Sequence, residues 1–151
     1  MLLTLGAIDI PNIGFTMNNE QAQEHIKQKL KEGDTLIGFF QAVSPPKLWM
    51  FFIIGPLATL STRMYFLAVT EKGLYFHKWS LIGNFKSYDF FEFDEIENVK
   101  IGKGILQRPM RFYFKNDRKI KVKAPLKGHK KLAKMTLDVQ NYIENRISLA
   151  R

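Results

Sequence analysis

Seven short segments of β-type composition follow one another between residues 34 and 124, and turn-like residues separate them. They cover residues 34–43, 63–70, 73–80, 85–93, 95–101, 110–116 and 118–124. Residues 63–70 are apolar at both odd and even positions, as expected for a strand covered on both faces. A chain of 151 residues with this order is predicted to form one mainly β domain, with helices at its two ends.

One amphipathic helix is predicted before the strands and one after them. Residues 19–31 carry apolar side chains at helical spacing, with Asn18 or Asn19 as the N-cap and Gly33 at the end. From about residue 127 a second helical stripe begins. It consists of Leu132, Met135, Val139, Tyr142, Ile143 and Ile147. Lysines 127, 130, 131 and 134 are grouped near its expected start.

Two hairpins can be assigned from their turns. The first turns at residues 71–73, where Gly73 is expected to supply a positive φ. The second is given a three-residue connection, 116–118, because a two-residue turn would place Lys119 opposite Phe114 on the core face. The predicted pairs are Phe114 with Ile120 and Phe112 with Val122.

Positive charge is concentrated in one stretch of the chain. Residues 1–99 hold 8 Lys and Arg against 11 Asp and Glu, whereas residues 100–134 hold 13 Lys and Arg against Asp117 alone. This asymmetry favours an anionic partner, either lipid headgroups, nucleic acid or an acidic protein surface. A surface that serves only solubility is the alternative.

The last hairpin places many of these cations on one face of the sheet. In the predicted register, Arg111, Tyr113 and Lys115 face Lys123, Lys121 and Lys119 across the strands, and like charges in such pairs repel. Acidic residues of the 89–97 segment are the alternative partners that would neutralise them. The candidate anion-binding residues are Arg111, Tyr113, Lys115, Lys119, Lys121, Lys123, Lys127, Lys130 and Lys131.

The segment from Leu48 to Leu60 contains no charged residue and is bracketed by Lys47 and Arg63. It is shorter than the roughly 20 apolar residues of a membrane-spanning helix, and an extension to Val69 would bury Arg63. Three interpretations stay open: a loop folded onto the domain's own core, a wedge in a membrane surface, or a contact with an identical subunit. The candidate contact residues are Lys47, Leu48, Trp49, Phe51, Phe52 and Arg63.

Several motifs resemble those of bacterial pleckstrin-homology-like (PH-like) domains. The hairpin from Val69-Thr70 to Phe76, the acidic segment from Phe93 to Val99, the lysine-rich hairpin and the closing helix follow that pattern over about residues 34–147. The resemblance implies a bent, partly open seven-stranded antiparallel barrel capped by a C-terminal helix. Residues 1–33 would then form an additional segment and helix packed on a domain of residues 34–151.

The chain departs from phosphoinositide-binding members of that group at the loop between the first two strands. Those members carry spaced lysines and arginines there, whereas here the loop is the apolar segment that follows Lys47. Specific recognition of inositol phosphates is therefore not implied. Bacterial relatives often form oligomers, which keeps the subunit-contact interpretation open.

Residues with catalytic or metal-binding spacing are not apparent. The three histidines are far apart in sequence, Gly102–Gly104 is not a phosphate-binding loop, and no G-x-S-x-G motif occurs. The acidic segment lacks the spacing of a calcium loop. We expect a noncatalytic protein without a cofactor.

The leading functional hypothesis is peripheral association with an anionic phospholipid surface. An oligomeric scaffold or protein-interaction module is the alternative, and nucleic-acid binding is a weaker third because no RNA-binding motif accompanies Tyr113. The absence of cysteine and of a signal-peptide pattern predicts a cytoplasmic protein, peripheral at the inner face of the plasma membrane.

Overall fold

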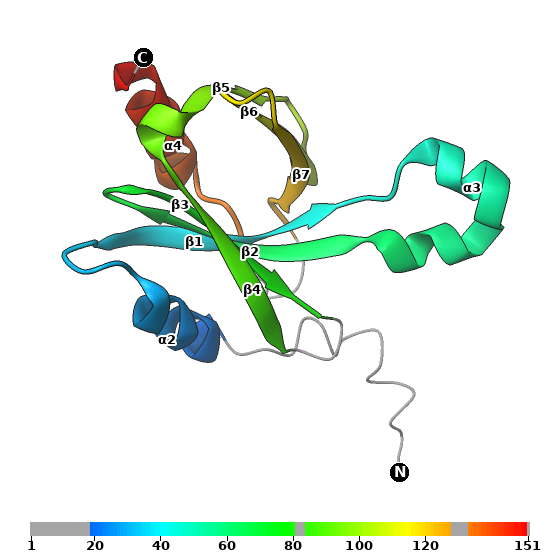
Figure 1. The fold of residues 1–151 in the computed structure, drawn as a ribbon, viewed down its shortest axis with the longest axis horizontal. Coiled ribbons are helices and arrows are strands. Elements are labelled where there is room, and N and C mark those ends of the chain that lie inside the picture. Colours follow the sequence, from blue (N-terminus) through cyan, green and yellow to red (C-terminus); the bar gives the residue numbers. More distant parts are fainter. Residues whose placement is uncertain (1–18, 81–83, 128–132, 151) are drawn as a thin grey trace, which may run out of the picture.

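The computed structural model describes residues 19–80, 84–127 and 133–150, and it shows seven strands in one antiparallel sheet (Figure 1). The strands are β1 (Leu36–Ser44), β2 (Arg63–Thr70), β3 (Gly73–Trp79), β4 (Phe85–Glu92), β5 (Ile96–Ile101), β6 (Gln107–Phe114) and β7 (Lys119–Pro125). Their order across the sheet is β4-β3-β2-β1-β7-β6-β5, so β4 and β5 are the two edges of an open barrel. The predicted fold class is confirmed.

The concave face of the sheet holds the main core. Its centre consists of fully buried side chains that alternate along their strands, among them Phe40, Phe76 and Phe112. Helix α4 (Leu137–Leu149) closes this core with Ile143 and Ile147. A 3-10 turn, η2 (Phe93–Glu95), joins β4 to β5, the two edge strands of the sheet.

The additional helix is α2 (Asn19–Lys29), which covers the outer face of β2, β3 and β4 (Figure 1). Ala22 and Ile26 are fully buried there, as their helical spacing predicts. The chain after α2 is tied to the sheet by the Tyr75 hydroxyl, which accepts a hydrogen bond from the Lys31 N–H (3.0 Å) and donates one to Asp34 (2.9 Å).

Two histidines that are far apart in sequence meet between α2 and the sheet. The ring centroids of His25 and His77 are 5.7 Å apart, and His25 stacks on Phe85 at 3.8 Å. His77 is 1% exposed, and its Nε2 atom has no hydrogen-bond partner. Burial, with smaller contributions from His25 and Lys29, lowers the pKa of His77 from 6.5 to about 4.

We expect His77 to make the fold less stable in mild acid. Between pH 6.5 and pH 4 the unfolded chain binds a proton at this residue and the folded chain does not, so stability falls as pH decreases. The loss between pH 7 and pH 5 should be up to about 2 kcal/mol. Urea unfolding at the two pH values should show a smaller loss for His77→Phe than for the wild type. An equal loss in both proteins would contradict this assignment.

The register of the β6–β7 hairpin differs from the predicted one by two residues. The observed pairs are Phe112 with Ile120 and Met110 with Val122. The connection does contain three residues, but these are residues 115–117, and the Phe114 N–H donates to the Arg118 carbonyl (2.9 Å). Asp117 adopts the left-handed conformation (φ 64°) that the predicted turn would have required of Arg118. Aspartate tolerates that conformation better than arginine does.

The predicted hairpin between β2 and β3 is present, but Gly73 is the first residue of β3 and its predicted role was wrong. Among the described residues, the glycines with positive φ are Gly33 and Gly55, so Gly73 does not supply one. Glycine is needed because a Cβ atom at this position would lie 2.1 Å from the Phe91 carbonyl oxygen on β4. Close approach of two backbones, rather than the turn conformation, therefore selects glycine here.

The closing helix begins later than predicted. Thr136 is its N-cap and accepts a hydrogen bond from the Val139 N–H (3.2 Å). Before it, the Ala133 carbonyl accepts from Gln41 of β1 (2.8 Å), and Met135 N–H donates to the Pro125 carbonyl (3.4 Å). These bonds to the sheet hold residues 133–135 in an extended path. Lys127 and Lys134 are therefore not in the helix, and Leu132 lies outside the described residues.

Candidate functional site

The apolar segment forms a helical excursion between β1 and β2. Helix α3 (Leu48–Ile54) ends at Gly55, and a 3-10 helix, η1 (Gly55–Ser61), leads back to the sheet. Gly55 has a φ of 60°, which allows the chain to reverse at this point. The excursion projects away from the barrel (Figure 1).

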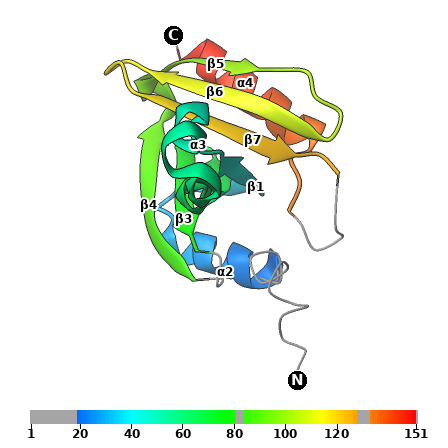
Figure 2. The same ribbon diagram turned by 90° about the vertical axis from the view of Figure 1, so that its right-hand side faces the viewer.

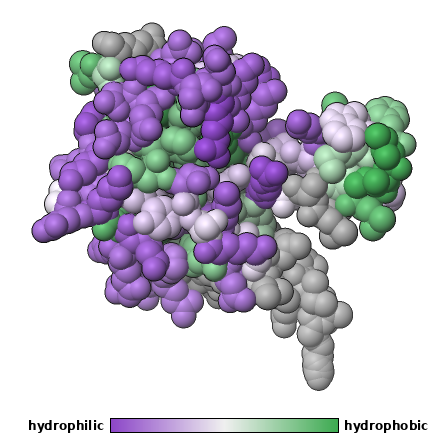
Figure 3. Space-filling model, in the orientation of Figure 1, coloured by the Kyte–Doolittle hydropathy of each residue, from purple (hydrophilic) through white to green (hydrophobic). Residues whose placement is uncertain are grey.

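Helix α3 buries none of its residues. Phe52 is 89% exposed and Trp49 is 56% exposed, and hydrophobic residues gather over this projection in Figure 3. The other large exposed apolar side chains of the excursion are Leu48, Phe51, Ile53, Ile54 and Leu57. The interpretation in which the segment folds onto the domain's own core is therefore wrong for α3. Among the described residues, no helix is both long and apolar enough to cross a bilayer.

The second feature is a basic face on the outer side of β5, β6 and β7. Lys100, Arg111 and Lys121 are direct neighbours across the three strands and form one row of cations. Neighbouring strands are about 4.8 Å apart, so this row places three positive charges within roughly 10 Å. Lys123 faces Pro109 one pair further along the same face. We call Lys100, Arg111, Lys119, Lys121 and Lys123 the basic face; all five are exposed.

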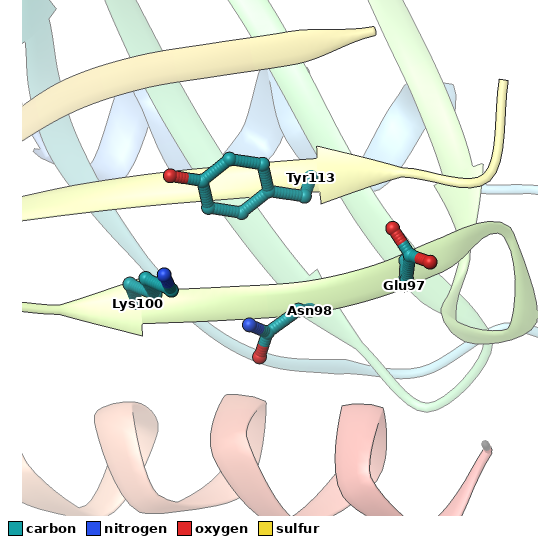
Figure 4. A pocket seen from close by; sticks show the side chains of 4 residues that line it. All are labelled: Glu97, Asn98, Lys100 and Tyr113. Carbon is teal, nitrogen blue, oxygen red and sulfur yellow. The ribbon is translucent and has the colours of Figure 1, made fainter. Parts of the chain in front are cut away.

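Tyr113 lies in the middle of this face, between two lysines. The Nζ atoms of Lys100 and Lys119 are 5.5 Å and 5.7 Å from its ring centroid. A shallow pocket of about 380 Å³ lies beside it, lined by Glu97, Asn98 and Lys100 of β5 and by Tyr113 of β6 (Figure 4).

Among the described residues, the acidic segment forms no ion pair with the basic face. Within the described ranges, the ion pairs join Asp89 to Lys78 (3.4 Å) and to Arg118 (3.5 Å). Glu92 and Glu95 are engaged in the capping box of η2. Among the described residues the cations of the basic face form no ion pair and repel one another, although Glu97 lines the pocket beside Lys100 and Tyr113.

The apolar excursion and the basic face lie on the same side of the molecule. Figure 2 looks onto the side from which α3 projects, and the broad faces of β6 and β7 are visible above α3 in that view. β1, which leads to the excursion, pairs with β7 through Val43 and Lys123. The strand that leads into the excursion, β1, is thus paired directly with β7, one of the strands that carry the basic face.

The other predicted site residues have mixed outcomes. Lys47 and Arg63 are exposed at the two ends of the excursion, and Lys115 and Lys127 are exposed beyond the ends of β6 and β7. Lys130 and Lys131 lie outside the described residues. Among the described residues, no three His, Cys, Asp or Glu side chains gather in an arrangement that could hold a metal ion.

Lys100 is the residue of the basic face that sequence reasoning missed. Its neighbours Val99 and Ile101 are partly buried, and this alternation does place Lys100 outward. The signal is obscured because the β5–β6 register shifts between Ile96 and Asn98, which interrupts the alternation along β5.

Comparisons with known proteins support the fold. No protein-family model matches the chain, and no curated protein matches it either. Among solved structures, the chain is similar to the hSac2 domain from the human phosphoinositide phosphatase Sac2, with a TM-score of 0.57 and 13% sequence identity. The similarity covers 88% of this chain and 82% of that domain's chain. The described fold is therefore a PH-like domain with an additional helix α2.

Proposed function

We propose that this chain is a noncatalytic PH-like domain that binds peripherally to anionic membranes at the cytoplasmic face. The observation that carries the proposal is the placement of the exposed α3 excursion and the basic face, which forms no ion pair among the described residues, on one side of the molecule. The apolar side chains enter the headgroup region, and the basic face attracts anionic lipids.

The two features complement each other energetically. Insertion of a few apolar side chains alone gives weak, reversible binding, and a cationic surface alone attaches only while salt screening is low. Each Lys or Arg close to an anionic surface contributes about 1 kcal/mol. Five cations together with the apolar excursion therefore supply the two signals that stable attachment requires.

Two side chains of α3 also suit a membrane surface. Trp49 suits the headgroup level because its indole combines an apolar body with an N–H donor, and Phe52 is the more exposed of the two side chains. The similar hSac2 domain comes from a phosphoinositide phosphatase, so a domain of this shape occurs in a protein named for action on phosphorylated lipids.

A second candidate function is self-association through α3. Monomeric proteins rarely leave apolar patches of more than a few hundred Å² uncovered, and α3 buries none of its residues within the chain. In this alternative an identical subunit covers Trp49, Phe51 and Phe52, and the protein acts as a scaffold. This alternative does not use the basic face.

Vesicle co-sedimentation separates the two functions. The proposal expects the protein to pellet with vesicles that contain phosphatidylserine and to stay in solution with vesicles of phosphatidylcholine alone. Binding should weaken as salt is raised above about 0.15 M, since the basic face is screened. Equal pelleting with both vesicle types, or none with either, would contradict the proposal. A stable oligomer without vesicle binding would favour the scaffold.

A further inference from the structure

The loop between β5 and β6, residues 102–106, exposes two large apolar side chains in addition to those of the α3 excursion. Ile105 and Leu106 are adjacent in sequence, and Leu106 is 65% exposed. They follow Lys103, which is also exposed. Neither apolar residue belongs to α3 or to the basic face.

The backbone of this loop is held at both ends. The Gly102 N–H donates to the Pro109 carbonyl (2.8 Å), and the Leu126 N–H donates to the Leu106 carbonyl (2.9 Å). These bonds attach the loop to β6 and to the segment that follows β7. Ile105 and Leu106 are thus presented outward by a fixed backbone, so their exposure is a feature of the fold.

The loop lies at one end of the β5–β6 hairpin, at the margin of the basic face (Figure 2). The β6–β7 turn lies at the opposite end and is polar, with Asn116 and Asp117 exposed. A flat surface that contacts the basic face meets both margins. Of these two margins, only the one with Ile105 and Leu106 carries large apolar side chains, whose transfer out of water is favourable.

We infer that the β5–β6 loop is a second insertion point for the anionic membrane, with Ile105 and Leu106 entering the headgroup region. The inference rests on the proposed function. The charges around the loop favour lipid as the occupant, because exposed Lys103 and Lys127 flank the apolar pair and can contact anionic headgroups. Together with α3, the loop would fix the orientation of the domain, since two apolar contacts define how the basic face lies on the surface.

Single-cysteine labelling tests this inference directly, because the chain contains no cysteine of its own. Leu106→Cys places an environment-sensitive fluorophore in the loop, and Phe52→Cys places one on α3. Leu149→Cys is the control: Leu149 is 81% exposed and lies at the C-terminal end of α4, on the far side of the barrel from α3 (Figure 1).

On vesicles containing phosphatidylserine, the emission at positions 106 and 52 should shift to shorter wavelength, and brominated lipids should quench it. The emission at position 149 should stay unchanged. If position 106 behaves like position 149 while position 52 shifts, the loop inference is wrong and the proposed function stands. If neither position 52 nor position 106 shifts, both are wrong.

The double variant Ile105→Ser/Leu106→Ser provides an unlabelled test. Because both side chains are exposed, the fold should be retained, which circular dichroism can verify. Affinity for the same vesicles should fall about tenfold, as expected for two shallowly inserted apolar side chains. Unchanged affinity would overturn the inference.

Discussion

Replacing Phe52 by aspartate is expected to lower the affinity for anionic vesicles by roughly 100-fold. Phe52 is the most exposed apolar side chain of α3, so in the proposed complex it loses the most contact with water. Removing its burial costs about 2–3 kcal/mol, and the new carboxylate is additionally repelled by anionic lipid. Co-sedimentation with vesicles containing phosphatidylserine measures the change.

The same substitution should leave the fold intact, because Phe52 contributes little to the core. Thermal unfolding of Phe52→Asp and of the wild type should therefore coincide within a few degrees. Leu149→Asp is a suitable control, since Leu149 is also highly exposed but belongs to α4. A Phe52→Asp variant that binds vesicles like the wild type would contradict the role of α3. If the wild type is an oligomer that this variant dissociates, the subunit-contact alternative gains support.

Reversing two charges of the basic face, with Arg111→Glu and Lys121→Glu together, should abolish measurable binding to anionic vesicles. Each reversal removes one attractive charge, worth about 1 kcal/mol, and adds a repulsive one. The double variant therefore loses roughly 4 kcal/mol of attraction at low salt, more than 100-fold in affinity.

The single variant Arg111→Glu separates the effect on membrane binding from the effect on stability. Arg111 lies between Lys100 and Lys121, so single Arg111→Glu replaces two repulsive cross-strand pairs by attractive ones. The free energy of unfolding should rise by about 0.5–1 kcal/mol while vesicle binding weakens.

The matched control for the double variant Arg111→Glu/Lys121→Glu is Lys27→Glu with Lys86→Glu. It changes the net charge by the same amount, at exposed sites on α2 and β4. An equal loss of binding in the control would show that total charge, and not the basic face, is responsible.

The sequence predicted the fold well because alternation and helical spacing report directly on burial. Ala22 and Ile26 of α2, and Ile143 and Ile147 of α4, are buried as their spacing requires. The outward face of β6 and β7 was also predicted correctly, since a register error of two residues leaves every side chain on its own face. Alternation along a strand therefore survived an incorrect turn.

What the sequence did not predict depends on contacts between distant segments. The start of α4 follows residues 133–135, which are hydrogen-bonded to β1 and to Pro125, and β1 is remote in sequence from them. The row of Lys100, Arg111 and Lys121 requires the register of three strands and a shift within β5. Whether α3 folds back or projects outward also depends on packing, because apolar composition is the same in both cases.

The fluorescence of Trp49 tests the membrane account most directly. The chain has two tryptophans, Trp49 on α3 and Trp79, which is only 5% exposed. The Trp79→Phe variant therefore leaves Trp49 as the sole tryptophan reporter. The account predicts emission typical of a water-exposed indole in the free protein. On adding vesicles with phosphatidylserine, the emission should shift to shorter wavelength and be quenched by brominated lipid. An emission spectrum that stays unchanged while such vesicles are added in excess would contradict the account.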